Sequence, residues 1–136
     1  MIYSALATPE GEVSQVFQAK SNIQFLAPDF LIEEIRGYLE DIAVPRAITK
    51  RKVTGGFQAL LDKIIIISKK DIPKECVLKA FEIVKEIDPD DFFFVALHLY
   101  AGHKIWTGDR ELINGLRKKG LDICVTTSQL KKILYK

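Results

Sequence analysis

The chain has 136 residues, of which 48% are hydrophobic and 28% are charged, and its formal net charge at pH 7 is +2. This length and composition fit one soluble globular domain and exclude a disordered or fibrous protein. The longest uncharged apolar run, residues 92–99, is far shorter than the ~20 residues that a membrane-spanning helix needs. Cys76 and Cys124 form no zinc or redox motif, and the first residues are not expected to act as a signal peptide. The sequence therefore predicts a cytoplasmic protein with two reduced thiols and no membrane partner.

Helices and strands are predicted to alternate along the whole chain. Apolar residues at helical spacing predict the helices, and short β-branched or apolar runs predict the strands. The clearest strand is the run of four isoleucines at residues 64–67, which we expect to be buried on both faces. The predicted order is helix 10–20, strand 23–27, helix 28–43 opened by Pro28, short helices on either side of a turn at Thr54-Gly55-Gly56, strand 64–67, a helix from Pro73, helix 91–100, strand 104–106, helix 110–118, strand 122–125 and helix 128–134.

This alternation favours an α/β fold with a mainly parallel sheet covered by helices on both sides. The sequence contains no internal repeat, low-complexity tract or linker. We therefore expect one compact domain over residues 1–136.

Two acids flank the most informative segment of the chain. Asp91 opens helix 91–100, and Asp109 follows strand 104–106 at its C-terminal end, which is the sheet edge where open α/β folds bind ligands. Two carboxylates at one edge repel each other unless a cation or a proton lies between them. A carboxylate cluster without cysteine or histidine favours Mg²⁺ or Mn²⁺ over zinc, so the sequence predicts a site for one of these ions.

Other acids of the chain have both a functional and a structural interpretation. Glu34 and Glu111 are aimed at the same sheet edge and are further candidate ligands. An acid in a first helical turn also favours the helix dipole by ~0.3–1 kcal/mol, so this alternative stays open for Glu34, Asp91 and Glu111. Asp88 and Asp90 are interpreted as helix caps, because Asp-Pro is a favoured helix entry.

Three short motifs follow one another over nearly the whole chain. They are Pro28-(x)5-Glu34-Ile35, Asp91-(x)3-Val95-Ala96-Leu97 and Thr107-Gly108-Asp109. Their order and spacing resemble the PIN domain (PilT N-terminus) family. The resemblance implies a three-layer α/β/α sandwich whose clustered acids bind Mg²⁺ or Mn²⁺ and hydrolyse RNA, less often DNA. Because many members are the toxin of a toxin–antitoxin pair and homodimers are frequent, it also implies RNA, an antitoxin protein and a second copy of the chain as partners.

The resemblance assigns roles to individual residues. Glu34, Asp91 and Asp109 match the metal-binding, catalytic acids, and Glu111 matches a fourth, more variable acid. Thr107 matches a hydroxyl residue that supports the site.

The start of the chain departs from the family pattern. PIN domains open with an apolar strand that ends in Asp, whereas this sequence begins at Met1, inside that pattern. We therefore expect the N-terminal strand and the first acid to be missing, either because they are encoded upstream or because the protein lacks them. In both cases the activity of this chain is expected to be compromised.

Arg46, Lys50, Arg51 and Lys52 form the strongest basic cluster. In a ribonuclease they bind phosphates with salt-dependent affinity; the alternative is a solvated surface. His98 is interpreted as a half-buried structural residue.

The sequence as a whole predicts a metal-dependent endoribonuclease of PIN type, active if the first acid is supplied upstream. The alternative is a catalytically degenerate PIN-like module that binds RNA or protein without cleaving RNA. A receiver-like signalling domain is disfavoured, because its acidic pair and its lysine are not visible in the sequence.

Overall fold

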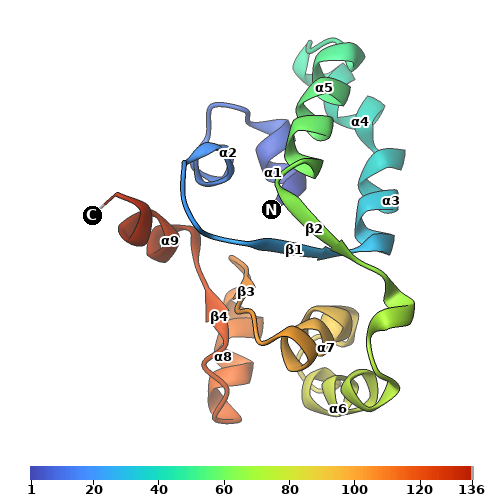
Figure 1. Ribbon diagram of the computed structural model, residues 1–136, viewed down its shortest axis with the longest axis vertical. Coiled ribbons are helices and arrows are strands. Elements are labelled where there is room, and N and C mark those ends of the chain that lie inside the picture. The colour runs from blue at the N-terminus through green and yellow to red at the C-terminus, as the bar shows by residue number, and fades with distance from the viewer. Residues whose placement is uncertain (136) are drawn as a thin grey trace. The chain divides into compact units, whose positions relative to one another are not determined.

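The computed structural model describes residues 1–135 and divides the chain into two compact units (Figure 1). One unit comprises residues 1–67 together with residues from 131 on, and the other comprises residues 68–130. Each unit contains one pair of parallel strands with helices. The predicted α/β class with parallel strands is therefore confirmed.

The first unit is built around the parallel pair of β1 (Phe25–Pro28) and β2 (Ile64–Ile67). The two strands lie side by side (Figure 1). In the pair, Phe25 lies opposite Ile64 and Pro28 lies opposite Ile67. Its core contains fully buried side chains, among them Val16, Ile42 and Phe57. Its elements are α1 (Ile2–Ala7), α2 (Glu12–Gln18), β1 (Phe25–Pro28), α3 (Asp29–Gly37), α4 (Leu39–Ala43), the 3₁₀ helix η1 (Val44–Arg46), α5 (Lys50–Leu61) and β2 (Ile64–Ile67).

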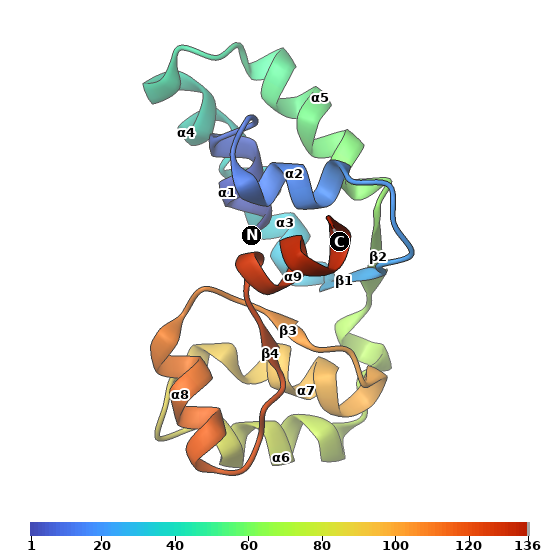
Figure 2. The same ribbon diagram turned by 90° about the vertical axis from the view of Figure 1, so that its left-hand side faces the viewer.

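The second unit packs three helices with a short parallel pair. Helices α6 and α7 lie side by side in both views (Figure 1 and Figure 2), and α7 buries Phe93 and Val95. Its elements are the 3₁₀ helix η2 (Lys69–Asp71), α6 (Lys74–Val84), the 3₁₀ helix η3 (Pro89–Asp91), α7 (Phe92–Ala101), β3 (Ile105–Trp106), α8 (Arg110–Lys118) and β4 (Cys124–Val125). Helix α9 (Thr127–Leu134) begins in this unit and ends in the first.

Three sequence-based expectations about local structure are wrong. The expected turn at Thr54-Gly55-Gly56 lies inside α5, which runs unbroken from Lys50 to Leu61. The strand of isoleucines is not buried on both faces, because Ile65 and Ile66 are 48% and 45% exposed. The expected helix 28–43 is divided at Tyr38, whose φ of −103° and ψ of 6° depart from helical geometry.

The expectation of a single domain over residues 1–136 stays a prediction. Both cysteines are free thiols, Cys124 buried and Cys76 half-buried. None of the helices found in residues 1–135 has the length and apolar character that crossing a bilayer requires.

Candidate metal centre

The turn at residues 88–91 places two acids at the start of α7. Asp88 is the N-cap of η3, and its Oδ1 accepts a hydrogen bond from the Asp90 N–H at 3.1 Å. Pro89 occupies the first position of this 3₁₀ turn, where its missing N–H costs nothing. Asp91 is the N-cap of α7, and within residues 1–135 its carboxyl accepts no capping hydrogen bond. The Asp88 carboxylate therefore caps the turn, while the backbone makes no use of the Asp91 carboxylate.

Asp109 is held at the end of β3 by the strand and by the helix that follows. The parallel pair continues past Trp106, since the Thr107 N–H donates to the Val125 carbonyl at 3.0 Å. The Thr107 hydroxyl accepts a hydrogen bond from the Asp109 N–H at 3.0 Å. Oδ1 of Asp109 then caps α8 by accepting from the N–H groups of Glu111 at 3.0 Å and Leu112 at 3.3 Å. Thr107 thus orients the backbone that carries the Asp109 carboxylate.

These two segments bring three carboxylates together. Asp88, Asp91 and Asp109 each offer an oxygen, and the three oxygens lie within 4.8 Å of one another. Asp88 and Asp91 are half-buried, whereas Asp109 is exposed. Three negative charges at this spacing repel one another, so the arrangement favours a bound cation or a proton.

The electrostatics of the group are most evident at Asp91. Burial is the main cause that raises the pKa of Asp91 from its usual 3.8 to about 6, and the charges of Asp88, Asp109 and Asp90 raise it further in that order. A positive ion among these oxygens has the opposite effect, because it favours the ionised carboxylate. A proton and a cation would therefore compete for this group of carboxylates.

Cys124 lies within the electrostatic reach of the same acids. Burial raises the pKa of its thiol, and Asp91 and Asp109 add to that effect, while Arg117 opposes it. The thiol therefore stays protonated at neutral pH and does not offer the thiolate that soft metals prefer. The donor set of three carboxylates fits a hard ion such as Mg²⁺ or Mn²⁺.

Asp88 was interpreted from the sequence as a cap only, and the structure places it both at a cap and in the carboxylate group. Its spacing was a usable signal. Asp88 is the N-cap of the 3₁₀ turn at residues 89–91, and Asp91 is the last residue of that turn. The Asp-Pro-x-Asp spacing therefore places the two carboxylates at the two ends of one turn.

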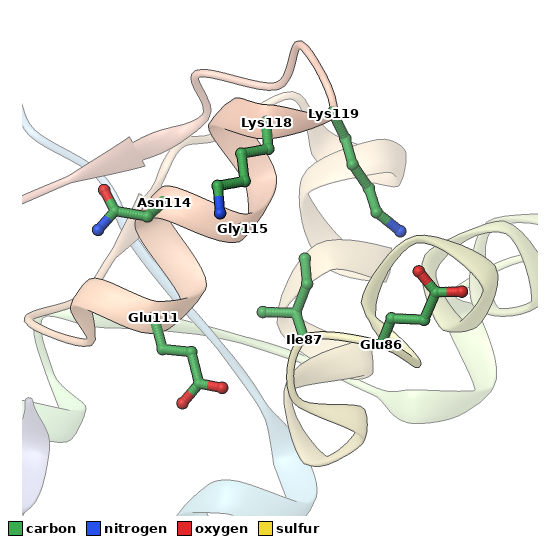
Figure 3. A pocket seen from close by; sticks show the side chains of 7 residues that line it. All are labelled: Glu86, Ile87, Glu111, Asn114, Gly115, Lys118 and Lys119. Atoms are coloured by element: carbon green, nitrogen blue, oxygen red, sulfur yellow. The ribbon is translucent and has the colours of Figure 1, made fainter.

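The structure does not bring Glu111 into the group, which among the described residues consists of Asp88, Asp91 and Asp109. Glu111 instead lines an open pocket of about 330 Å³ on the side of α8 that faces the end of α6 (Figure 3). The remaining lining residues are Glu86, Ile87, Asn114, Gly115, Lys118 and Lys119. Glu34 is exposed on α3, in the other compact unit.

The four basic candidates of the first unit differ in their surroundings. Arg46 donates from Nη1 to the Ile42 carbonyl at 3.1 Å, and Lys50 pairs with Glu40 at 2.7 Å. Arg51 and Lys52 are exposed in the first turn of α5. Arg46 ends η1 and the other three open α5, so all four lie in one short basic segment, residues 46–52.

His98 has the structural surroundings that the sequence indicated. It is half-buried in α7, and its Nδ1 lies 2.7 Å from the carbonyl oxygen of His103. Because a carbonyl only accepts hydrogen bonds, Nδ1 carries the proton. His98 thereby connects α7 to the loop that leads into β3.

Comparison with known proteins identified one family. A family model described as a PIN domain matches residues 1–131. Comparisons with curated proteins and with solved structures gave no match.

Proposed function

The chain belongs to the PIN domain family, and from this we propose that it is a metal-dependent endoribonuclease that hydrolyses phosphodiester bonds in RNA. The nuclease-type fold and the group of three aspartates are the features from which the proposal starts. The observation that carries it is the convergence of Asp88, Asp91 and Asp109 at the start of α7 and α8.

We propose that these three carboxylates hold Mg²⁺ or Mn²⁺. A bound ion of this kind lowers the pKa of a water molecule and stabilises the charge that develops on the phosphate during hydrolysis. Asp91 must lose its proton before it binds a cation. Since its pKa is raised to about 6, the affinity for Mn²⁺ is expected to rise steeply with pH up to about that value.

The catalytic set proposed from the family pattern is Glu34, Asp91 and Asp109, with Glu111 as a further ligand and Thr107 as the supporting hydroxyl. The hydrogen bond from the Asp109 N–H to Thr107 supports the last assignment. The position of Glu111 in the pocket beside α8 weakens its assignment. The first acid of the family pattern stays a prediction.

The proposed RNA-binding segment comprises Arg46, Lys50, Arg51 and Lys52. The last three fill the first turn of α5, where each cation is unfavourable by ~0.3–1 kcal/mol because it meets the positive end of the helix dipole. A bound phosphate offsets this repulsion, so the unfavourable arrangement supports an anionic ligand. Binding through these residues is expected to weaken as salt rises.

The alternative proposal is a degenerate PIN-like module that binds RNA or protein without cleaving RNA. The basic segment favours it, because that segment has no need of the acidic group. A role as the toxin of a toxin–antitoxin pair, a homodimer and a cytoplasmic location are further parts of the proposal that follow from the family alone.

The test is cleavage of single-stranded RNA with Mn²⁺ by the wild-type chain, by Asp91→Asn and by Asp122→Asn. Asp122 is an exposed acid that pairs with Arg117 and serves as the matched control. We expect Asp91→Asn to lose both Mn²⁺ binding and cleavage, and Asp122→Asn to keep both. RNA cleavage that survives Asp91→Asn contradicts the proposed site.

Two comparisons extend this test. An upstream-extended chain that cleaves faster than this one supports the prediction of a missing first acid. RNA binding with no cleavage in either chain supports the non-cleaving module.

A further inference from the structure

An unusually close contact joins α8 to the residue before Asp88. A Cβ at Gly115 would lie 2.8 Å from both Cγ1 and Cγ2 of Ile87 and 2.9 Å from its Cδ1. Figure 3 shows the Ile87 side chain directed at the turn of α8 that carries Gly115. Distances this short do not occur between real side-chain carbons, so the contact requires glycine at this position.

A change of rotamer at Ile87 does not make room for a larger residue. The two γ carbons of isoleucine occupy two of the three staggered positions around the Cα–Cβ bond. Any rotation leaves at least one γ carbon in a position that is occupied now, and both occupied positions lie 2.8 Å from the added Cβ. A methyl group at Gly115 therefore displaces the backbone of Ile87 or that of α8.

The Ile87 backbone is continuous with the acidic turn. The N–H groups of Ile87 and Asp88 both donate to the Val84 carbonyl, at 2.8 and 2.9 Å, where α6 ends. A second connection lies at the C-cap of α8, one helical turn past Gly115, where Lys119 Nζ donates to the Ile83 carbonyl at 2.6 Å. Asp88 therefore moves with Ile87. The end of α6 and the residues that follow it contact α8 and its C-cap at two points.

The other end of α8 carries the third acid. Asp109 is the N-cap of α8, six residues before Gly115, which is about 9 Å along the helix axis at 1.5 Å per residue. The contact between Gly115 and Ile87 thus fixes how far the Asp88 turn lies from the Asp109 cap. We infer that Gly115 is a positioning residue of the metal centre. Because glycine has no side chain, Ile87 packs directly against α8, and this contact sets the separation of Asp88 from Asp109. This inference rests on the proposed function, because it treats the three carboxylates as a cation site.

The experiment compares Gly115→Ala with Gly120→Ala in the full chain. Gly120 lies just beyond α8 and has a φ of +80°, so alanine there is strained. Apart from its two chain neighbours, no described residue has an atom within 4 Å of the added Cβ. Gly120→Ala therefore disturbs the same part of the fold without touching Ile87. Mn²⁺ affinity is measured by electron paramagnetic resonance, and the melting temperature is measured alongside it.

We expect Gly115→Ala to weaken Mn²⁺ binding about tenfold or more, as changes in the shell that supports metal ligands do. Gly120→Ala is expected to lower the melting temperature and leave Mn²⁺ binding within about twofold of wild type. The double variant Gly115→Ala/Ile87→Ala, in which both γ carbons are removed, should bind Mn²⁺ more tightly than Gly115→Ala alone. If Gly115→Ala only lowers the melting temperature, as Gly120→Ala does, the contact is mere packing and the inference is wrong.

A readout without metal separates this inference from the proposed function. The Asp90 N–H donates to Asp88 Oδ1, so its NMR chemical shift reports the position of that carboxylate. It should change in Gly115→Ala and stay unchanged in Gly120→Ala. If the wild type binds no Mn²⁺, the proposed function fails while a shifted Asp90 amide still supports the positioning role. An unshifted Asp90 amide overturns the inference whatever the wild type binds.

Discussion

Replacement of Asp91 by asparagine is expected to stabilise the metal-free protein and to abolish its response to Mn²⁺. The reason is the raised pKa of Asp91, about 6 against a usual 3.8. The folded protein holds the Asp91 proton more tightly than the unfolded chain does. The stability that this proton contributes is complete below pH 3.8 and is lost as the pH rises to about 6. Asparagine keeps the shape of the side chain and never ionises.

The size of the gain follows from the same two values. At about 1.36 kcal/mol per pKa unit, the rise from 3.8 to about 6 corresponds to roughly 3 kcal/mol. Asp91 is only half-buried, so screening by water reduces this to about 1–2 kcal/mol. Removing a negative charge from the start of α7 costs about 0.5 kcal/mol through the helix dipole. We therefore expect Asp91→Asn to raise the free energy of unfolding by about 1 kcal/mol at pH 8 and to leave it unchanged below pH 3.8.

Urea unfolding measures this difference. Trp106, the only tryptophan in the sequence, lies on β3 in the same compact unit as the three acids and reports its unfolding by fluorescence. With EDTA at pH 8 the variant should be the more stable protein. Mn²⁺ at a hundred times its dissociation constant stabilises a binding protein by about 2.7 kcal/mol, so with Mn²⁺ the wild type should become the more stable one. The reasoning is refuted if Asp91→Asn is less stable than the wild type in EDTA at pH 8, or if Mn²⁺ stabilises both proteins equally.

Three further substitutions test other parts of the structure. Gly55→Ala should stabilise α5 by about 0.5–1 kcal/mol in urea unfolding, since outside its chain neighbours and the local helix backbone no described atom lies within 4 Å of the added Cβ. A destabilised variant would instead favour a turn at this position. Lys52→Glu creates a capping box with Thr49 and should stabilise the protein by about 0.5–1 kcal/mol. Fluorescence anisotropy should show weaker binding to single-stranded RNA, with the slope of log affinity against log salt concentration smaller by about one. An unchanged RNA affinity would show that Lys52 does not bind RNA. Thr107→Val should weaken Mn²⁺ binding about tenfold, because the Asp109 N–H loses its acceptor. Thr107→Ser keeps the hydroxyl and should leave Mn²⁺ binding unchanged. Equal effects of the two variants would argue against a role for the hydroxyl.

Elements that are defined by their own residues were predictable from the sequence. The helix predicted at residues 110–118 is α8 (Arg110–Lys118), with an Asp109 cap before it and Gly120 at a φ of +80° after it. The helix predicted at residues 91–100 is α7 (Phe92–Ala101), which ends at Gly102, also at a φ of +80°. Caps and left-handed glycines act within one turn, so a local sequence window contains the information that places them.

Elements that depend on packing were not predictable in the same way. Two adjacent glycines cost a helix about 1 kcal/mol each relative to alanine, which favoured a turn at Gly55-Gly56. The α5 helix nevertheless continues because it buries Val53, Phe57 and Leu60 and is capped by Thr49. In the run of four isoleucines no alternation of residue type marks the exposed positions, so the sequence did not reveal that Ile65 and Ile66 are exposed.

The geometry of Asp88 shows that one carboxylate can cap a turn and also lie in a group of acids. The cap at Asp88 uses Oδ1, as does the cap at Asp109, and each carboxylate has a second oxygen. A capping bond also holds the side chain in one orientation, which reduces the entropy that a cation must remove when it binds. The capping interpretation of Asp88 was therefore correct and incomplete. What it lacked was the distance to Asp109, which depends on the contact between Ile87 and Gly115 and is invisible to any local pattern. A sequence window can show that an acid caps a helix, but only the packing of α8 against the end of α6 decides whether that acid has two others beside it.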